Sequence, residues 1–115
     1  MSTAVAEPPV EAPPAEQANK PKPRRQPPYA VVVLNDDLHT YHYVIFTLMK
    51  VFGYDEVKSY QLARLIDTDG RARVWTGTLE GAELKRDLIR SAGPDLFAAQ
   101  KVEFPLGVEL EPLPN

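Results

Sequence analysis

The chain has 115 residues, no cysteine and a formal net charge of −3 at pH 7. Such a length corresponds to one domain, and the lack of cysteine excludes a fold held by disulfides. The first 28 residues carry four basic and three acidic side chains, which leaves 9 basic and 13 acidic residues, a net charge of −4, for the rest. This balance argues against nucleic acid as a partner.

Residues 1–28 hold eight of the twelve prolines and almost no aromatic or branched apolar residue. We therefore expect a disordered, proline-rich N-terminal arm over residues 1–28, followed by a single domain over residues 29–115. The start of the chain lacks a basic segment followed by an apolar one, and no run approaches membrane-spanning length. We expect a cytoplasmic protein without a membrane partner.

The first folded elements are predicted on either side of a polar stretch. Tyr29–Leu34 is a short, β-branched apolar run and predicts a strand covered on both faces. Asn and Asp side chains bond to nearby backbone and end strands, so the polar residues 35–40 mark its end. Thr40 can then cap a helix over residues 41–52, which Gly53 closes.

The middle of the chain predicts a helix and then a strand. Asp55 begins a helix whose apolar residues recur at helical spacing, and the helix ends in a turn over residues 67–70. Residues 71–78 alternate and predict a strand with Ala72, Val74 and Thr76 on one face. Trp75 is interpreted as a packing residue rather than a ligand platform.

The last elements are a helix capped by Thr78 and ended by Gly93-Pro94, then an irregular stretch over residues 95–101. Alternation from Leu106 onward predicts a half-buried final strand, which Pro105 places at a sheet edge or start. The order β-α-α-β-α-β predicts an α+β domain with a small three-stranded antiparallel sheet and three helices packed on one face.

The polar stretch is the strongest candidate for a functional site. If it stays extended, Asn35 and Asp37 face one way and Asp36 the other, so that Asn35, Asp37 and Asp67 could form a cation-binding cup. One alternative is a metal site built on Asp36, His39 and His42 at successive spacings of three, although no HExxH-type element accompanies it. A second alternative is a turn and helix cap without function.

Four sequence features together resemble the ClpS family, from Tyr29 to about Lys85. They are Tyr29-x-Val-Val-Val-Leu-Asn-Asp-Asp, the turn Phe52-Gly53-Tyr54, the turn at Gly70 and the tetrapeptide Ala82-Glu83-Leu84-Lys85. ClpS proteins are adaptors that hold substrates by destabilising N-terminal residues and pass them to a Clp AAA+ unfoldase and its protease. The resemblance implies a non-catalytic, monomeric adaptor with no cofactor and no metal, whose N-terminal arm is drawn toward the unfoldase channel during delivery.

The resemblance also implies roles for individual residues. The substrate α-amine would be bound by Asn35, Asp36 and Asp37 together with Asp67, which stands where the family has a histidine. The substrate side-chain pocket would comprise Leu34, His39, Tyr41, Val44, Ala63, Ile66 and Leu106. The docking surface for the unfoldase N-terminal domain would comprise Glu80, Glu83 and Lys85. A divergent module that docks on the unfoldase without recognising N-termini remains an alternative.

Overall fold

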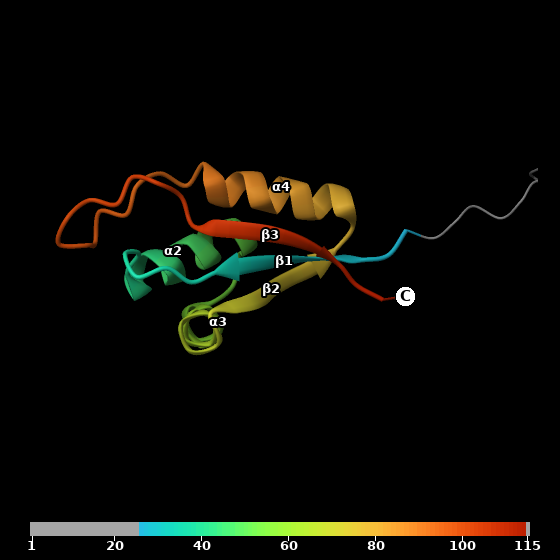
Figure 1. Cartoon of the computed structure of the whole chain (residues 1–115), viewed down its shortest axis with the longest axis horizontal. Coiled ribbons are helices and arrows are strands. Elements are labelled where there is room, and N and C mark those ends of the chain that lie inside the picture. The colour runs from blue at the N-terminus through green and yellow to red at the C-terminus, as the bar shows by residue number, and fades with distance from the viewer. Residues whose placement is uncertain (1–25, 115) are drawn as a thin grey trace, which may run out of the picture.

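A three-stranded antiparallel sheet and three helices make up residues 26–114, the part of the chain that the computed structural model describes (Figure 1). The elements are β1 (Tyr29–Leu34), α2 (Tyr41–Phe52), α3 (Glu56–Asp69), β2 (Arg71–Gly77), α4 (Leu79–Arg90) and β3 (Gly107–Pro112). This confirms the predicted fold class and element order. The predicted disorder of the N-terminal arm lies, for residues 1–25, outside the described residues.

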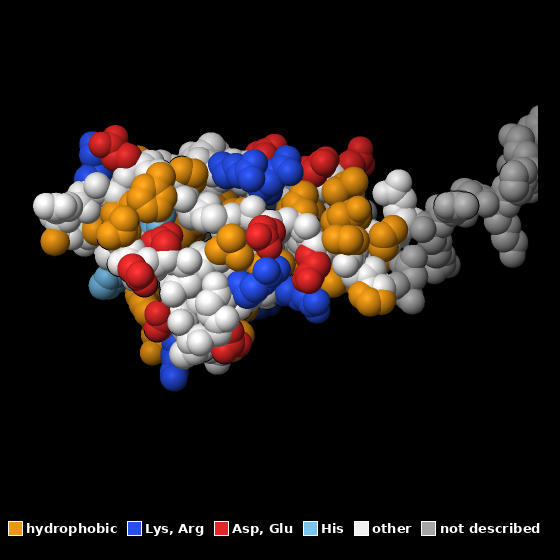
Figure 2. Space-filling view, in the orientation of Figure 1, with side chains coloured by type: hydrophobic (Ala, Val, Ile, Leu, Met, Phe, Trp, Pro, Cys, Tyr) orange, Lys and Arg blue, Asp and Glu red, His pale blue; other side chains and the backbone are white. Residues whose placement is uncertain are grey.

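Strand β1 is the centre of the sheet, which has the order β2-β1-β3 with both pairings antiparallel. Its β-branched residues are buried on both faces. On the face without helices, Val32 lies between Arg73 and Glu109, and ion pairs join Arg71 to Glu109 at 3.1 Å and Arg73 to Glu111 at 2.8 Å. Figure 2 shows acidic and basic side chains interleaved on the surface over the strands. The charged pairs therefore cover the second face of an apolar strand.

The helices bury their apolar faces against the other side of the sheet. Helix α2 contributes Val44, Leu48 and Val51 to the core, while its first residue, Tyr41, is exposed. The predicted inner face of α3 is buried at Ala63 and Ile66. None of the described helices has both the length and the apolar character that a membrane crossing requires.

The prediction for β2 assigned some of its residues to the wrong face of the sheet. Strand β1 pairs Val31 with Trp75 but Val32 with Arg73, so Val74 is an extra residue in β2. A bulge of this kind shifts the alternation by one. As a result Trp75 packs against the core and Thr76 is exposed, whereas the alternation predicted that Thr76 would share the face of Val74. Trp75 is a packing residue, as predicted.

The indole ring of Trp75 also explains a glycine inside α4. A Cβ atom at Gly81 would lie 2.8 Å from the ring, and one at Gly77 would overlap it. Glycine normally weakens a helix by about 1 kcal/mol relative to alanine. Here the missing side chain lets the indole ring pack against the first turn of α4.

Two helix ends differ from the prediction. Helix α3 continues through Asp69 and ends at Gly70, which has the left-handed φ of 83°, so Asp67 lies in the last helical turn and not in a turn after it. Helix α4 ends at Arg90, before the expected stop at Gly93-Pro94. The position of Asp67 matters for the site because it sets the direction of its carboxylate.

Candidate functional site

A cavity of about 280 Å³ lies between the polar stretch 35–40, the start of α2 and the last turns of α3. We call residues 35–40 the acidic loop and this space the site cavity. The cavity is lined by Asn35, Asp36, Asp37, His39, Thr40, Tyr41, Val44, Ala63, Ile66 and Asp67. The fold thus brings together residues from three elements that the sequence had grouped into an α-amine cup and a side-chain pocket.

Two of the predicted pocket residues do not line the site cavity. Leu34 lies opposite Gly107 in the pairing of β1 with β3, and its side chain would be 3.3 Å from a Cβ atom on that glycine. Leu106 is 3% exposed and belongs to the hydrophobic core. Leu34 therefore packs against β3, and Leu106 packs in the core.

The floor and the rim of the site cavity have opposite characters. Val44, Ala63 and Ile66 are buried apolar residues that meet where α2 packs on α3. Asn35 and Asp37 are exposed, and within residues 26–114 no protein hydrogen bond engages their side chains. The Asn35 backbone N–H donates to the Gly70 carbonyl at 2.9 Å and ties the acidic loop to the end of α3. The result is an apolar recess with unengaged acceptors at its edge.

Asp36 folds back onto the acidic loop. Its Oδ1 accepts hydrogen bonds from the backbone N–H groups of Leu38 and His39, both at 2.8 Å, and its Oδ2 lies 2.6 Å from the His39 ring Nδ1. Partial burial raises the pKa of Asp36, but the hydrogen bonds from His39 and Leu38 outweigh burial and hold the pKa below its ordinary value. This geometry assigns Asp36 to holding the acidic loop in shape.

The His39 ring forms one wall of the site cavity and is bonded at both nitrogens. Nδ1 faces Asp36, and Nε2 lies 2.9 Å from the backbone carbonyl oxygen of Phe104. The side chain is 2% exposed, and its ring stacks on Tyr43 with centroids 5.1 Å apart. These contacts fix the orientation of the ring against the acidic loop.

The alternative metal site does not assemble. His42 stacks on Phe97 with ring centroids 5.7 Å apart, away from the His39 and Asp36 pair. Within residues 26–114 no group of three or more His, Cys, Asp or Glu side chains is placed to hold a metal ion. The reason is that the acidic loop is not helical, so spacings of three do not put side chains on one face.

The mouth of the site cavity is crossed by a hydrogen bond between two helices. The Tyr41 hydroxyl donates to Asp67 Oδ2 at 2.9 Å. This bond raises the pKa of Tyr41, because the neighbouring carboxylate favours the protonated phenol. Asp67 thus lines the site cavity with its carboxylate bonded to Tyr41.

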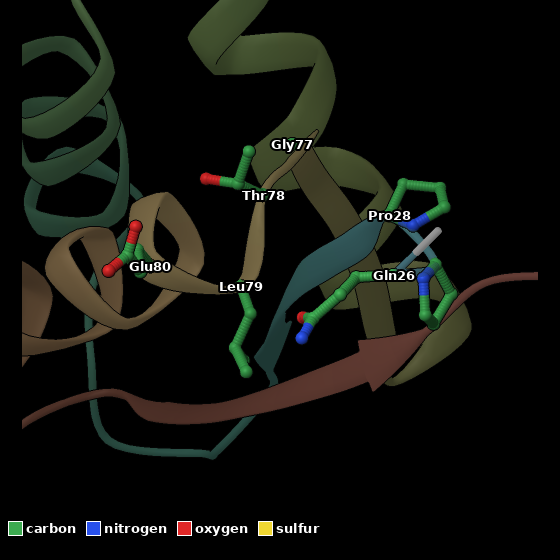
Figure 3. A pocket seen from close by; sticks show the side chains of 7 residues that line it. Gln26, Pro28, Gly77, Thr78, Leu79 and Glu80 are labelled. Carbon is green, nitrogen blue, oxygen red and sulfur yellow. The ribbon is translucent and has the colours of Figure 1, made fainter. Parts of the chain in front are cut away.

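The predicted docking residues divide between two surfaces. Glu80, in the first turn of α4, borders a shallow hollow of about 650 Å³ that is also lined by Gln26, Pro27, Pro28, Gly77, Thr78 and Leu79. Figure 3 shows Gln26 and the prolines on one side of it and Leu79 on the other. Glu83 is exposed on α4.

Lys85 belongs to a different surface from Glu83. It follows Glu83 by two residues, which on a helix of 3.6 residues per turn turns it about 200° away. Its Nζ donates to the Val51 carbonyl at 3.1 Å and lies 5.6 Å from the centroid of the Phe52 ring. Lys85 therefore binds the C-terminal end of α2, where a cation is also favoured by the helix dipole.

Two contributions to the site were missed by sequence reasoning. Thr40, interpreted only as a helix cap, also lines the site cavity. Asp95 and Phe104 contact the acidic loop from the segment between α4 and β3. That segment lacks any periodic pattern, so no signal in the sequence pointed to these contacts.

Comparison with known proteins identifies one family. The family model for the ATP-dependent Clp protease adaptor protein ClpS matches residues 24–109. The chain is 35% identical to the ATP-dependent Clp protease adapter protein ClpS of Nostoc sp., over 68% of this chain and 81% of the relative. It is also 35% identical to the adapter of the same name from Thermosynechococcus vestitus, over 61% and 76% of the two chains.

A solved structure is similar as well. Agrobacterium tumefaciens ClpS2 bound to L-phenylalaninamide has a TM-score of 0.62 and 29% sequence identity, and the match covers 77% of this chain and 100% of that one. The chain therefore belongs to the ClpS family of non-catalytic adaptors of the ATP-dependent Clp protease, and it is not an enzyme.

Proposed function

We propose that this chain binds the N-terminal residue of substrate proteins and delivers them to a Clp AAA+ unfoldase for degradation. The observation that carries the proposal is the site cavity itself, an apolar recess edged by the unengaged acceptors of Asn35 and Asp37. A protein's N-terminal residue has the matching chemistry, an ammonium group beside a side chain. The Agrobacterium relative was solved with L-phenylalaninamide, which also joins a free amine to an aromatic side chain.

The rim suits an α-ammonium group. Such a group has a pKa of about 7.7 to 8.0 and is mostly charged at neutral pH. It offers three donors, which Asn35, Asp37 and Asp67 would accept. No lysine or arginine lines the site cavity, and within residues 26–114 no ion pair engages Asp37 or Asp67. Each charge-assisted hydrogen bond contributes roughly 1.5 to 3 kcal/mol.

The floor suits an apolar first side chain. Val44, Ala63 and Ile66 are buried and apolar, and the cavity of about 280 Å³ has room for one large side chain. Burying a leucine-sized or phenylalanine-sized side chain contributes roughly 1.5 to 3 kcal/mol. Two or three hydrogen bonds and this burial, less the association entropy, correspond to an affinity of about 1 μM.

Asp67 would replace the family's histidine as an acceptor for the amine. Its Oδ2 is held by the Tyr41 hydroxyl, which fixes the carboxylate at the mouth of the site cavity. A carboxylate has about four lone-pair sites, so one bond from tyrosine leaves others for the ammonium group. In this account Tyr41 orients Asp67 and narrows the mouth.

The unfoldase N-terminal domain would dock at the start of α4. Glu80 and Glu83 are exposed there, and the adjoining hollow offers the apolar side chains of Leu79 and Pro28 (Figure 3). This surface lies apart from the site cavity, with no shared lining residue. An adaptor needs this separation because it holds a substrate and an unfoldase together. Lys85 is left out of the proposed surface because it holds the end of α2.

One observation favours a second candidate, a module that docks on the unfoldase without binding N-termini. The hydrogen bond between Tyr41 and Asp67 crosses the mouth of the site cavity and occupies the residue that replaces the family's histidine. A panel of short peptides that differ only in the first residue separates the two candidates. N-terminal recognition predicts micromolar binding for Phe, Trp and Leu peptides and none for Asp peptides. Absence of binding across the panel, with retained binding of the unfoldase domain, would establish the docking module instead.

A further inference from the structure

The segment that joins α4 to β3, residues 91–106, contacts the acidic loop from the side opposite to α3. It has no regular helix or strand. Two of its own residues form an isolated β-bridge, in which Asp95 and Val102 exchange backbone hydrogen bonds of 2.8 and 3.2 Å. Both residues of this bridge are buried. The bridge therefore closes the segment on itself, and the two buried residues hold it against the fold.

The central contact of this segment is the carboxylate of Asp95, which is 0% exposed. Its Oδ2 accepts hydrogen bonds from the Thr40 backbone N–H at 2.8 Å and from the Thr40 hydroxyl at 3.1 Å. Its Oδ1 accepts from the Phe97 N–H at 2.9 Å. Among residues 26–114 no cation forms an ion pair with Asp95. The buried carboxylate of Asp95 therefore depends on hydrogen bonds from neutral donors, and the loss of any one donor would leave a buried acceptor unsatisfied.

Thr40 connects Asp95 to the site cavity. Its hydroxyl donates a hydrogen bond to Asp95 and accepts one from the Tyr43 N–H at 3.1 Å as the N-cap of α2. Thr40 itself lines the site cavity, as the last residue of the acidic loop before Tyr41. The position of Asp95 consequently fixes where the acidic loop ends and where α2 begins.

Two further contacts from the same segment hold the neighbours of Thr40. The Phe104 carbonyl accepts the His39 ring Nε2 at 2.9 Å, and the Tyr43 hydroxyl donates to the Gly93 carbonyl. Residues 39, 40 and 43 are thus each bonded to residues 91–106. Helix α3 forms the other side of the site cavity and takes no part in these bonds.

We propose that Asp95 is a positioning residue for recognition of the substrate α-amine, acting through Thr40 to hold the acidic loop in its binding geometry. The proposal rests on the proposed function, because it assumes that Asn35 and Asp37 accept the amine. Asp95 does not reach the site cavity, so it would act on the loop and not on the ligand.

The test compares Asp95→Asn with Glu103→Gln. Asparagine keeps the size of Asp95 but puts an amide N–H₂ against one of its N–H donors. Glu103 is an exposed carboxylate of the same segment without a contact to the acidic loop, so its change controls for the lost charge. The measurements are amide hydrogen exchange of residues 36–40 in the free protein and affinity for a peptide that begins with Phe, with a free and with an acetylated amine.

Asp95→Asn should accelerate exchange at Thr40 and His39 and weaken binding of the free-amine peptide roughly tenfold, the effect of losing one strong hydrogen bond in the cup. The acetylated peptide should change little, and Glu103→Gln should match wild type. Unchanged exchange in Asp95→Asn would overturn the proposal. So would faster exchange with unchanged affinity, since Asp95 would then serve only the fold.

A second pair of variants serves if Asp95→Asn does not fold. Thr40→Val removes the hydroxyl that bonds to Asp95 but also removes the cap of α2. Thr78→Val removes the equivalent cap of α4, where Thr78 accepts the Gly81 N–H at 3.0 Å far from the acidic loop. Only Thr40→Val should weaken the free-amine peptide, and equal effects of the two would overturn the proposal. The two failures can be told apart. If wild-type protein binds free-amine and acetylated peptides equally, the proposed function is wrong. Hydrogen exchange needs no ligand and still shows whether Asp95 holds the acidic loop.

Discussion

The hydroxyl of Tyr41 donates a hydrogen bond to Oδ2 of Asp67 and so joins the first turn of α2 to the last turn of α3 across the mouth of the site cavity. The bond fixes the carboxylate at the position where the family has a histidine. It also means that any amine bound at this edge meets a tyrosine and an aspartate that already interact. Two of the predictions below depend on this pair.

The first prediction concerns the pKa of Tyr41. The bond to Asp67 raises this pKa because it favours the protonated phenol. The bond therefore contributes to stability at and below pH 10, and its contribution is lost as the pH rises through the raised pKa. Asp67→Asn should bring the pKa of Tyr41 down toward 10, as followed by NMR titration of its ring. Asp69→Asn, a change in the same helical turn, should leave the pKa of Tyr41 at its wild-type value. Equal pKa shifts in both variants would contradict a hydrogen bond between Tyr41 and Asp67.

The second prediction concerns the contribution of Asp67 to binding. If its carboxylate accepts the substrate amine, Asp67→Asn should weaken a peptide that begins with Phe by roughly tenfold or more. Tyr41→Phe removes the bond that orients Asp67 and should weaken the same peptide about fivefold, less than the loss of the carboxylate itself. Isothermal titration calorimetry measures both. Unchanged affinity in Asp67→Asn would mean that the carboxylate only accepts the tyrosine hydroxyl.

The third prediction concerns the shape of the site cavity. Tyr41 narrows the mouth, while Ala63 leaves depth at the floor, so aromatic first residues should bind better than branched aliphatic ones. Ala63→Met should fill that depth and weaken Trp and Phe peptides more than Val peptides. Leu62→Met is a volume-conserving control next to the cavity wall. Competition binding gives the rank order of affinities for peptides with different first residues. The same rank order in wild type and Ala63→Met would contradict the assignment of Ala63 to the floor of the site cavity.

Much of the fold could be predicted because local chemistry determined it. The β-branched run of β1 and the caps at Thr40, Asp55 and Thr78 are local features, and each appears where the sequence placed it. The bulge at Val74 was not predictable in this way, because it depends on how β2 pairs with β1. Trp75 and Thr76 consequently exchanged faces.

The predictable part of the site was its acidic loop and apolar floor. Asn35, Asp37, Ala63 and Ile66 lie around one cavity, as the sequence suggested, while their functional roles remain proposals. Leu106 and Val108 are both buried, as their alternation predicted, but Leu106 belongs to the core and does not line the site cavity. The contacts of Asp95 join residues 55 positions apart through an aperiodic segment, and local pattern carries no information about such contacts.

The fourth prediction concerns the proline-rich arm, for which we propose a role in delivery. Residues 1–25 should be removed by starting the chain at Gln26, because Gln26 and Pro28 line the hollow beside Glu80 and belong to the proposed docking surface. The shortened protein should bind peptides and the unfoldase N-terminal domain as full-length protein does. It should nevertheless fail to accelerate degradation of a reporter with an N-terminal Phe by the reconstituted protease. Degradation at the full-length rate would show that the arm has no part in delivery.

The fifth prediction tests the central claim, that Asn35, Asp37 and Asp67 bind a free α-amine. The measurement is fluorescence anisotropy with one labelled peptide that begins with Phe, prepared with a free and with an acetylated amine. Acetylation removes the charge and two of the three donors, so the acetylated peptide should bind at least about tenfold more weakly. Equal affinity for the two peptides would contradict recognition of the α-amine and leave docking on the unfoldase as the function of this chain.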